Sequence, residues 1–222
     1  MKRGFGKREF ALGLGLIAGL VALAPARLLL PAPPLAATEV TGSLWQAELI
    51  GAMLGQMPLG DVGLALQPVA LLQGRLNWQS QGALNGQIWR SFTAGGVSGL
   101  TGRLNGSPMP SLPLSGIDLA DVMATLDGAG RCEAAGGQVT ADLALPLAGQ
   151  RQLAGAPRCD GAALLLPLAS SDGRVRLDVS SSVGRWTARL VVAGAGPGEA
   201  AALVAAGFRS EADTLIKEAG GA

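Results

Sequence analysis

Residues 40–76 read VTGSLWQAELIGAMLGQMPLGDVGLALQPVALLQGRL, and this stretch decides the fold. Apolar residues alternate with polar or small ones, and a glycine recurs every few positions. Val62, Leu64 and Leu66 stand two residues apart, which is the side-chain period of a strand with one covered face. The same pattern of turn, glycine and short alternating strand continues along most of the chain. It predicts a mainly all-β fold built from short strands.

The composition suits a glycine-rich β-domain of moderate size. The chain has 222 residues, of which Gly 34 and Pro 13 make up about a fifth, a share that favours turns and strands. Hydrophobic residues reach 49%, which supplies a core and argues against disorder. Charged residues reach only 15%, against roughly 25% in typical soluble domains. Small and uncharged polar side chains must therefore cover much of the surface.

The composition also lacks the residues that most catalytic sites use. The chain contains no His and no Tyr, which removes the commonest general base and metal ligand. Asp118 and Asp121 stand close in sequence, but helix capping and solvation account for them. Beyond residue 30 the chain carries 12 basic and 15 acidic side chains, so no nucleic-acid-binding surface is expected. We predict no catalytic residue, no cofactor and no metal, and therefore not an enzyme.

The N-terminus predicts a membrane anchor. Four basic residues precede an apolar run, and residues 10–30 are long enough for a transmembrane helix, which needs about 20 residues. The basic residues place the tail of residues 1–9 in the cytoplasm by the positive-inside rule. The alternative is a signal peptide cleaved near Ala24-Pro25-Ala26, against which Pro25 and Arg27 count. In both cases the remainder of the chain lies outside the cytoplasm.

The exported part divides into a linker, a β-domain and a tail. Residues 31–38 form a Pro/Ala linker, residues 39–210 a periplasmic β-domain, and residues 211–222 a polar tail. Nine to eleven strands joined by short turns predict a curved antiparallel meander sheet. Its apolar face could hold an acyl chain or form an ordinary core.

Two stretches predict short helices. In residues 118–126, Leu119, Val122, Met123 and Leu126 fall on one helical face. Residues 197–208 begin with proline and end near Gly207, which is typical of a helix.

Two cysteines, Cys132 and Cys159, stand 27 residues apart. No CxxC motif is present, and no histidine could complete a zinc site. An even pair in an exported domain predicts one disulfide, and the alternative is two buried, unpaired thiols.

The opening stretch resembles a known family. The resemblance is carried by VTGSLW at residues 40–45, PLG at residues 58–60 and LQPVALLQGRL at residues 66–76. These sequences are similar to the periplasmic region of type II secretion system protein N, the N component of the general secretion pathway. A glycine-studded middle and an alanine-rich end extend the resemblance in outline. Within these segments, we take as the family-motif residues Gly42, Leu44, Trp45, Pro58, Leu59, Gly60, Pro68, Leu71, Leu72 and Gly74.

The resemblance implies a single-pass protein of the bacterial inner membrane with its main domain in the periplasm. It implies a non-catalytic accessory of the secretion machine, whose partners include the inner-membrane connector and the outer-membrane secretin. The matching residues serve either structure or partner contact; Trp45, for example, is expected mainly to pack. The alternative is an AsmA-like β-groove that binds lipid in the cell envelope.

Overall fold

The chain folds around one open antiparallel sheet. The computed structural model describes residue 25 and residues 35–43, 45–54, 57–106, 111–146, 149–182 and 185–221. Sixteen strands of these residues form one sheet in nearly sequential order. The predicted all-β class and antiparallel meander are therefore confirmed, while the predicted transmembrane helix lies, apart from Pro25, outside the described residues.

The first half of the sheet contains β1 to β8 and one short helix. Its elements are β1 (Leu35–Ala36), β2 (Glu39–Ser43), β3 (Gln46–Leu54), β4 (Met57–Leu66), α2 (Pro68–Leu71), β5 (Leu76–Gly82), β6 (Leu84–Arg90), β7 (Ala94–Asn105) and β8 (Leu114–Asp127). The sheet thus begins before the predicted boundary at residue 39, because β1 and β2 both pair with β3.

The second half contains β9 to β16 and a helix near its end. Its elements are β9 (Cys132–Leu145), β10 (Gly149–Gly155), β11 (Arg158–Asp160), β12 (Ala163–Ser170), β13 (Val175–Ser182), β14 (Arg185–Ala193), α3 (Pro197–Ala205), β15 (Arg209–Glu211) and β16 (Thr214–Gly221). Most of the predicted polar tail therefore belongs to the sheet, because β16 pairs with β14.

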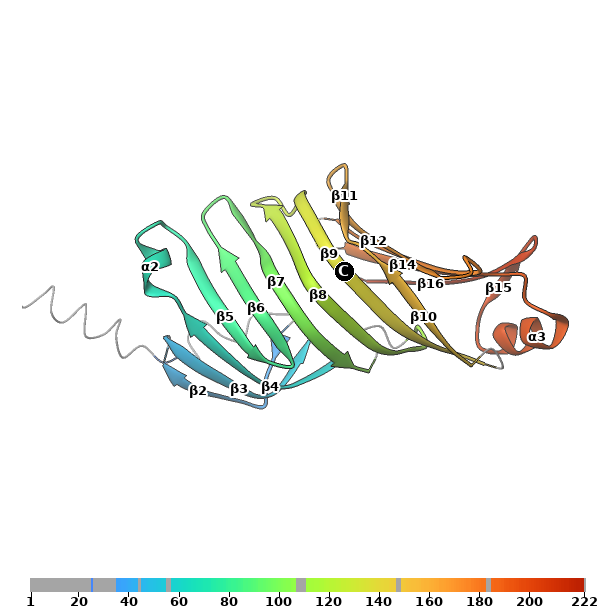
Figure 1. Cartoon of the computed structure of the whole chain (residues 1–222), viewed down its shortest axis with the longest axis horizontal. Helices are drawn as coiled ribbons and strands as arrows, with labels where there is room; N and C mark the ends of the chain where they lie inside the picture. Colours follow the sequence, from blue (N-terminus) through green and yellow to red (C-terminus); the bar gives the residue numbers. More distant parts are fainter. Residues whose placement is uncertain are drawn as a thin grey trace, which may run out of the picture.

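The sheet curls so that its two ends turn toward one face. Figure 1 shows β5 to β9 as a broad layer, with β2 to β4 turned beneath it and β12, β14 and β16 behind β9 and β10. The inner face of the second half forms the larger core, which includes Leu143 of β9 and Leu190 of β14, both fully buried. α3 covers one end of this core with Leu203.

A smaller core fills the fold between β3, β4 and the middle strands. It contains Leu49, Val62 and Leu64, with Trp78 packed against its side. Ile117 of β8 packs against both cores and so joins them. The curled sheet therefore buries its own apolar face along most of its length.

The predicted helix at residues 118–126 is wrong, because these residues belong to β8. The strand carries a bulge in which Asp121 has φ +52° and the pairing with β9 jumps from Ala120 to Met123. Because a bulge adds one residue to a strand, side chains three positions apart across it point to the same face of the sheet. Leu119 and Val122 therefore both pack against the larger core at a spacing that imitates a helix.

The other predicted local features are confirmed. α3 begins at Pro197 and matches the predicted helix in position. Cys132 and Cys159 form a disulfide with their Cα atoms 5.5 Å apart, which ties β9 to β11. The alternative of two unpaired thiols is therefore wrong.

Candidate functional site

Half of the family-motif residues gather at one end of the sheet. The β2–β3 turn and the end of β4 meet there, because Leu66 donates its backbone N–H to the Trp45 carbonyl at 2.9 Å. Pro68, Leu71, Leu72 and Gly74 follow in α2 and the turn after it. The structure brings these residues beside Trp45 and the β2–β3 turn, as the sequence could not show.

The remaining motif residues have other positions. Gly42 lies in β2 with φ +88°, and a Cβ there would overlap the Gln46 carbonyl, so the hairpin requires glycine. Pro58, Leu59 and Gly60 lie in β4 toward its opposite end, and Leu59 is buried in the smaller core. Leu44 lies outside the described residues.

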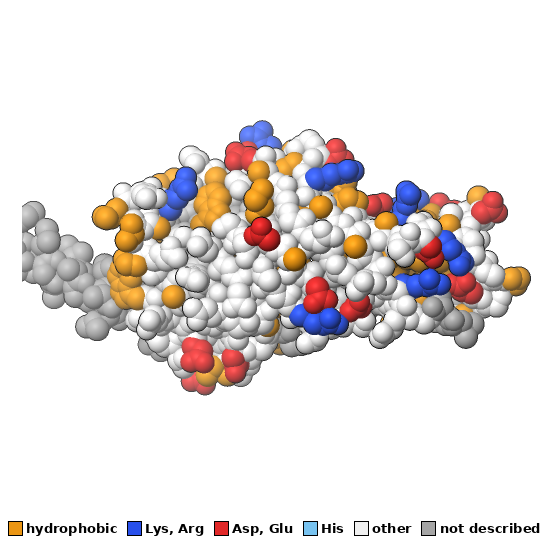
Figure 2. All heavy atoms as spheres, in the orientation of Figure 1, with side chains coloured by type: hydrophobic (Ala, Val, Ile, Leu, Met, Phe, Trp, Pro, Cys, Tyr) orange, Lys and Arg blue, Asp and Glu red, His pale blue; other side chains and the backbone are white. Residues whose placement is uncertain are grey.

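Large apolar side chains are exposed where α2 lies. Leu76, the first residue of β5, pairs with Arg90, the last residue of β6. The connection that contains α2 ends just before Leu76 and the β6–β7 turn starts just after Arg90, so both lie at the same end of the sheet. We define the α2 end by its exposed apolar residues, which are Val69, Leu71, Leu72, Ile88 and Phe92. Leu72 is 90% exposed and Phe92 is 97% exposed. Figure 2 shows hydrophobic side chains at this end, on the left.

A polar ladder adjoins the α2 end. Asn77 donates to Gln67 Oε1 at 3.0 Å and approaches Gln87 Oε1 at 3.4 Å, while Arg75 lies 5.6 Å from the centre of the Trp89 ring. These contacts fix the end of β5 relative to its neighbours. The Asn77 Oδ1 atom is buried and accepts no hydrogen bond from the described residues.

Among the described residues, β2 and β15 lie at the two edges of the sheet, and Pro25 bridges Ser43 at the end of β2. β2 carries one charged residue, Glu39, in five, whereas β15 carries Arg209 and Glu211 in three. Charged and very short edge strands resist pairing with another chain. The β2 edge is therefore the better acceptor for an added strand.

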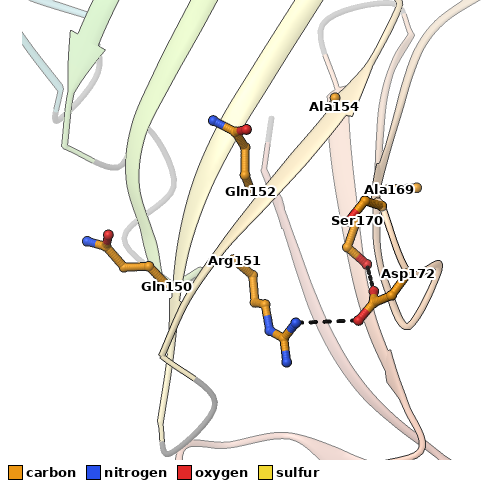
Figure 3. Close-up of a pocket in the computed structure, with 8 residues that line it drawn as sticks. Gln150, Arg151, Gln152, Ala154, Ala169, Ser170 and Asp172 are labelled. Carbon is orange, nitrogen blue, oxygen red and sulfur yellow. Dashed lines mark hydrogen bonds and ion pairs between the residues drawn. The ribbon is translucent and has the colours of Figure 1, made fainter.

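A hollow of about 360 Å³ lies between β10 and the β12–β13 turn. Figure 3 shows its lining from both sides, with Gln150, Arg151, Gln152, Ala154, Ala169, Ser170 and Asp172 labelled. The Asp172 carboxylate accepts from Ser170 Oγ at 2.5 Å and from Arg151 Nη1 at 3.4 Å. Val175 donates its backbone N–H to Ser170 Oγ at 3.0 Å, so these bonds close a turn.

The electrostatics of this hollow do not suit proton transfer. The Ser170 hydroxyl, and then the Arg174 backbone N–H, lower the pKa of Asp172. A carboxyl with a lowered pKa is a weaker base than an ordinary one, and catalytic bases work best with a pKa near the operating pH. The Ser170–Asp172 pair is therefore a structural element of the turn.

The described residues offer neither a metal site nor a membrane-spanning helix. No group of three or more Cys, Asp or Glu side chains in this part of the chain is placed to hold a metal ion. No helix formed by these residues is both long enough and apolar enough to cross a membrane.

The α2 end was not predicted from the sequence as an exposed surface. Its signal is a short apolar run, Val69 to Leu72, that follows Pro68 in a connection between two strands. An apolar run of four residues reads equally well as part of a core.

Together, the fold and its surface define a disulfide-linked, single-sheet β-protein with an exposed apolar end and an edge strand, β2, beside it. Comparison with protein families gives a match to the model for type II secretion system (T2SS), protein N, over residues 33–214. The chain belongs to this family, as its opening stretch predicted. No curated protein and no solved structure matches the chain.

Family membership makes the chain a component of type II secretion and associates it with the cell envelope and the other components of that system. The match gives no support to the AsmA-like alternative.

Proposed function

We propose that the chain is a non-catalytic accessory of the type II secretion system, anchored in the inner membrane by residues 10–30 with its sheet in the periplasm. The observation that carries the proposal is the family match, which spans residues 33–214 and so covers nearly the whole sheet. The disulfide between Cys132 and Cys159 agrees with an oxidising compartment. In this proposal the chain supports the export of folded proteins across the outer membrane by binding other secretion components, and it catalyses no reaction.

The β2 edge is our candidate for that contact. A partner segment in extended conformation can add to a free strand through backbone hydrogen bonds, which supply affinity, while side chains supply specificity. After Glu39, β2 offers the uncharged residues Val40, Thr41 and Gly42, and it lies beside Trp45 at the start of the family motif. The proposed partners are the inner-membrane connector and the outer-membrane secretin.

Photo-crosslinking in intact cells tests this contact. A benzoylphenylalanine replaces Glu39, an exposed residue of β2, in the full chain carrying a C-terminal tag. We expect crosslinked products that contain another secretion component. The matched control carries the same group at Arg209 on the β15 edge, which is also exposed and should give little product.

A charge on the edge strand provides a second test. Thr41→Lys should weaken crosslinking from position 39, since edge lysines oppose strand addition. Equal crosslinking from positions 39 and 209, or no effect of Thr41→Lys, would contradict the proposed edge. The mass of the tagged chain on the same blot shows whether residues 10–30 are retained.

A further inference from the structure

Pro25, which precedes the strands in the sequence, contacts the sheet at the α2 end. Pro25 forms an antiparallel bridge with Ser43, the last residue of β2. The β2–β3 turn that follows Ser43 is bonded to the end of β4 through Trp45 and Leu66, and α2 begins two residues later. Pro25, which directly follows the apolar run of residues 10–24 in the sequence, therefore contacts the sheet at the same end as the exposed leucines and Phe92.

The same end is basic. The sequence has no acidic residue between Asp61 and Asp118, a segment that includes α2 and the β6–β7 turn. Arg75 and Arg90 are both exposed and flank these two connections. Asp127, which pairs with Ala94 just after the β6–β7 turn, is bound in an ion pair with Arg131. At the opposite ends of the strands, arginines and acids pair with one another, as Arg151 does with Asp172.

We propose that the α2 end lies on the anionic surface of the membrane that anchors the chain. Val69, Leu72 and Phe92 enter the interfacial region, while Arg75 and Arg90 pair with lipid phosphates. This inference rests on the membrane anchor of the proposed function. It assigns a ligand, an anionic phospholipid surface, to the part of the family motif that forms α2.

Peripheral membrane contacts commonly combine apolar side chains that insert into the interface with basic side chains that bind phosphate. Exposed leucine and phenylalanine side chains gain by leaving water, and Arg guanidinium groups form charge-assisted hydrogen bonds with phosphate. Because the anchor already holds the chain at the membrane, the contact of the α2 end with the lipid surface is effectively intramolecular. Weak apolar and electrostatic interactions are then enough to hold the sheet in one orientation.

Site-specific fluorescence on the full chain in liposomes tests the contact. The two native cysteines are paired, so an added cysteine is the one available for labelling. Leu72→Cys and Phe92→Cys carry an environment-sensitive dye in vesicles of phosphatidylethanolamine and phosphatidylglycerol. Ser171→Cys, an exposed position in the β12–β13 turn, is the matched control. We expect a blue shift and quenching by spin-labelled lipid at 72 and 92, with neither at 171.

The outcomes separate this inference from the anchor. If the chain sediments with the vesicles but the dyes at 72 and 92 stay in water, the anchor stands and the surface contact is wrong. If the chain does not sediment with the vesicles, both the anchor and the contact are contradicted. Equal quenching at 171 would show unspecific insertion and would also overturn the proposed orientation.

The arginines are tested separately from the apolar residues. Arg75→Gln combined with Arg90→Gln should reduce quenching at position 72 in vesicles that contain phosphatidylglycerol, with the affinity for the surface falling roughly fivefold per arginine at low salt. Arg176→Gln, an exposed arginine of β13, is the matched control and should change nothing. The same loss with Arg176→Gln, or no loss with the double variant, would overturn the headgroup contact.

Discussion

At the residue scale, one glycine allows the β8 bulge to form. Gly137 of β9 has φ +98° and lies opposite the two residues of the bulge, Asp121 and Val122. A Cβ at Gly137 would lie 2.6 Å from the Val122 Cα and still closer to the Asp121 carbonyl. Backbone on both sides leaves no room for relaxation, so this position tolerates glycine alone.

Gly137→Ala should therefore lower the free energy of unfolding by about 2–4 kcal/mol, from left-handed backbone strain and steric overlap. Denaturant titration measures the loss. Gly198→Ala in α3 is the matched control, because its Cβ meets nothing within 4 Å and helical alanine should stabilise slightly. Equal effects of the two substitutions would show that the bulge does not require glycine.

The lowered pKa values of two carboxyl groups set the pH below which the free energy of unfolding should fall. The backbone N–H of Arg131, and then its side chain, lower the pKa of Asp127, and the Ser170 hydroxyl lowers that of Asp172. A lowered folded-state pKa adds stability above the ordinary value of 3.8 and loses it as the pH falls through the folded value. Stability should thus decline below about pH 4.

Asp127→Asn with Asp172→Asn should flatten this decline, since the substituted groups no longer take up protons. The free energy of unfolding, measured by urea titration from neutral to acid pH, gives the slope. Asp178→Asn, on the exposed side of β13, is the control and should leave the slope nearly unchanged. If the free energy of unfolding of the double variant fell as steeply with pH as that of the wild type, these two carboxylates would not cause the acid decline.

At the element scale, the sequence predicted best where strands are regular. Val175, Leu177 and Val179 alternate with charged residues, and they form β13 with Val175 and Leu177 buried. β8 was predicted wrongly because its bulge shifts the alternation by one residue, and a single sequence does not show which partner strand absorbs the shift. The motif residues were found, but the exposure of Leu72 was not, because a short apolar run reads equally well as part of a core.

The disulfide belongs to this scale because it joins the β11–β12 hairpin to the start of β9. Replacing both Cys132 and Cys159 by alanine should lower the free energy of unfolding by roughly 3–4 kcal/mol, since the unfolded chain regains the freedom of the loop that the bond closes. Urea midpoints of the oxidised chain and the variant measure the effect. Identical midpoints would mean that the bond contributes nothing to folding.

At the scale of the whole molecule, the two cores should unfold together. Ile117 packs against both, and the strands between them are continuously paired. Leu49→Ala in the smaller core and Leu143→Ala in the larger should each cost about 2–5 kcal/mol. Both should shift one cooperative transition, followed by tryptophan fluorescence and circular dichroism. Two separate transitions, each moved by one variant, would show that the halves are independent.

The molecule's architecture suits an anchored accessory of secretion. One end carries the apolar and basic residues proposed to meet the membrane, and β2 beside it is the edge strand proposed to meet a partner. The smaller core holds these features in fixed positions, because it packs β3 and β4 against the middle strands. Membrane contact and partner contact thus depend on the same half of the sheet.

The central claim, that the chain supports type II secretion, is tested most directly by locating the exported proteins. A strain that lacks the chain is compared with the same strain expressing the wild-type chain or its Thr41→Lys variant. The measurement is the ratio of a type II substrate in the medium to that in the periplasm. The account predicts periplasmic accumulation without the chain, full recovery with the wild type and incomplete recovery with Thr41→Lys. A ratio that is unchanged by loss of the chain would contradict it.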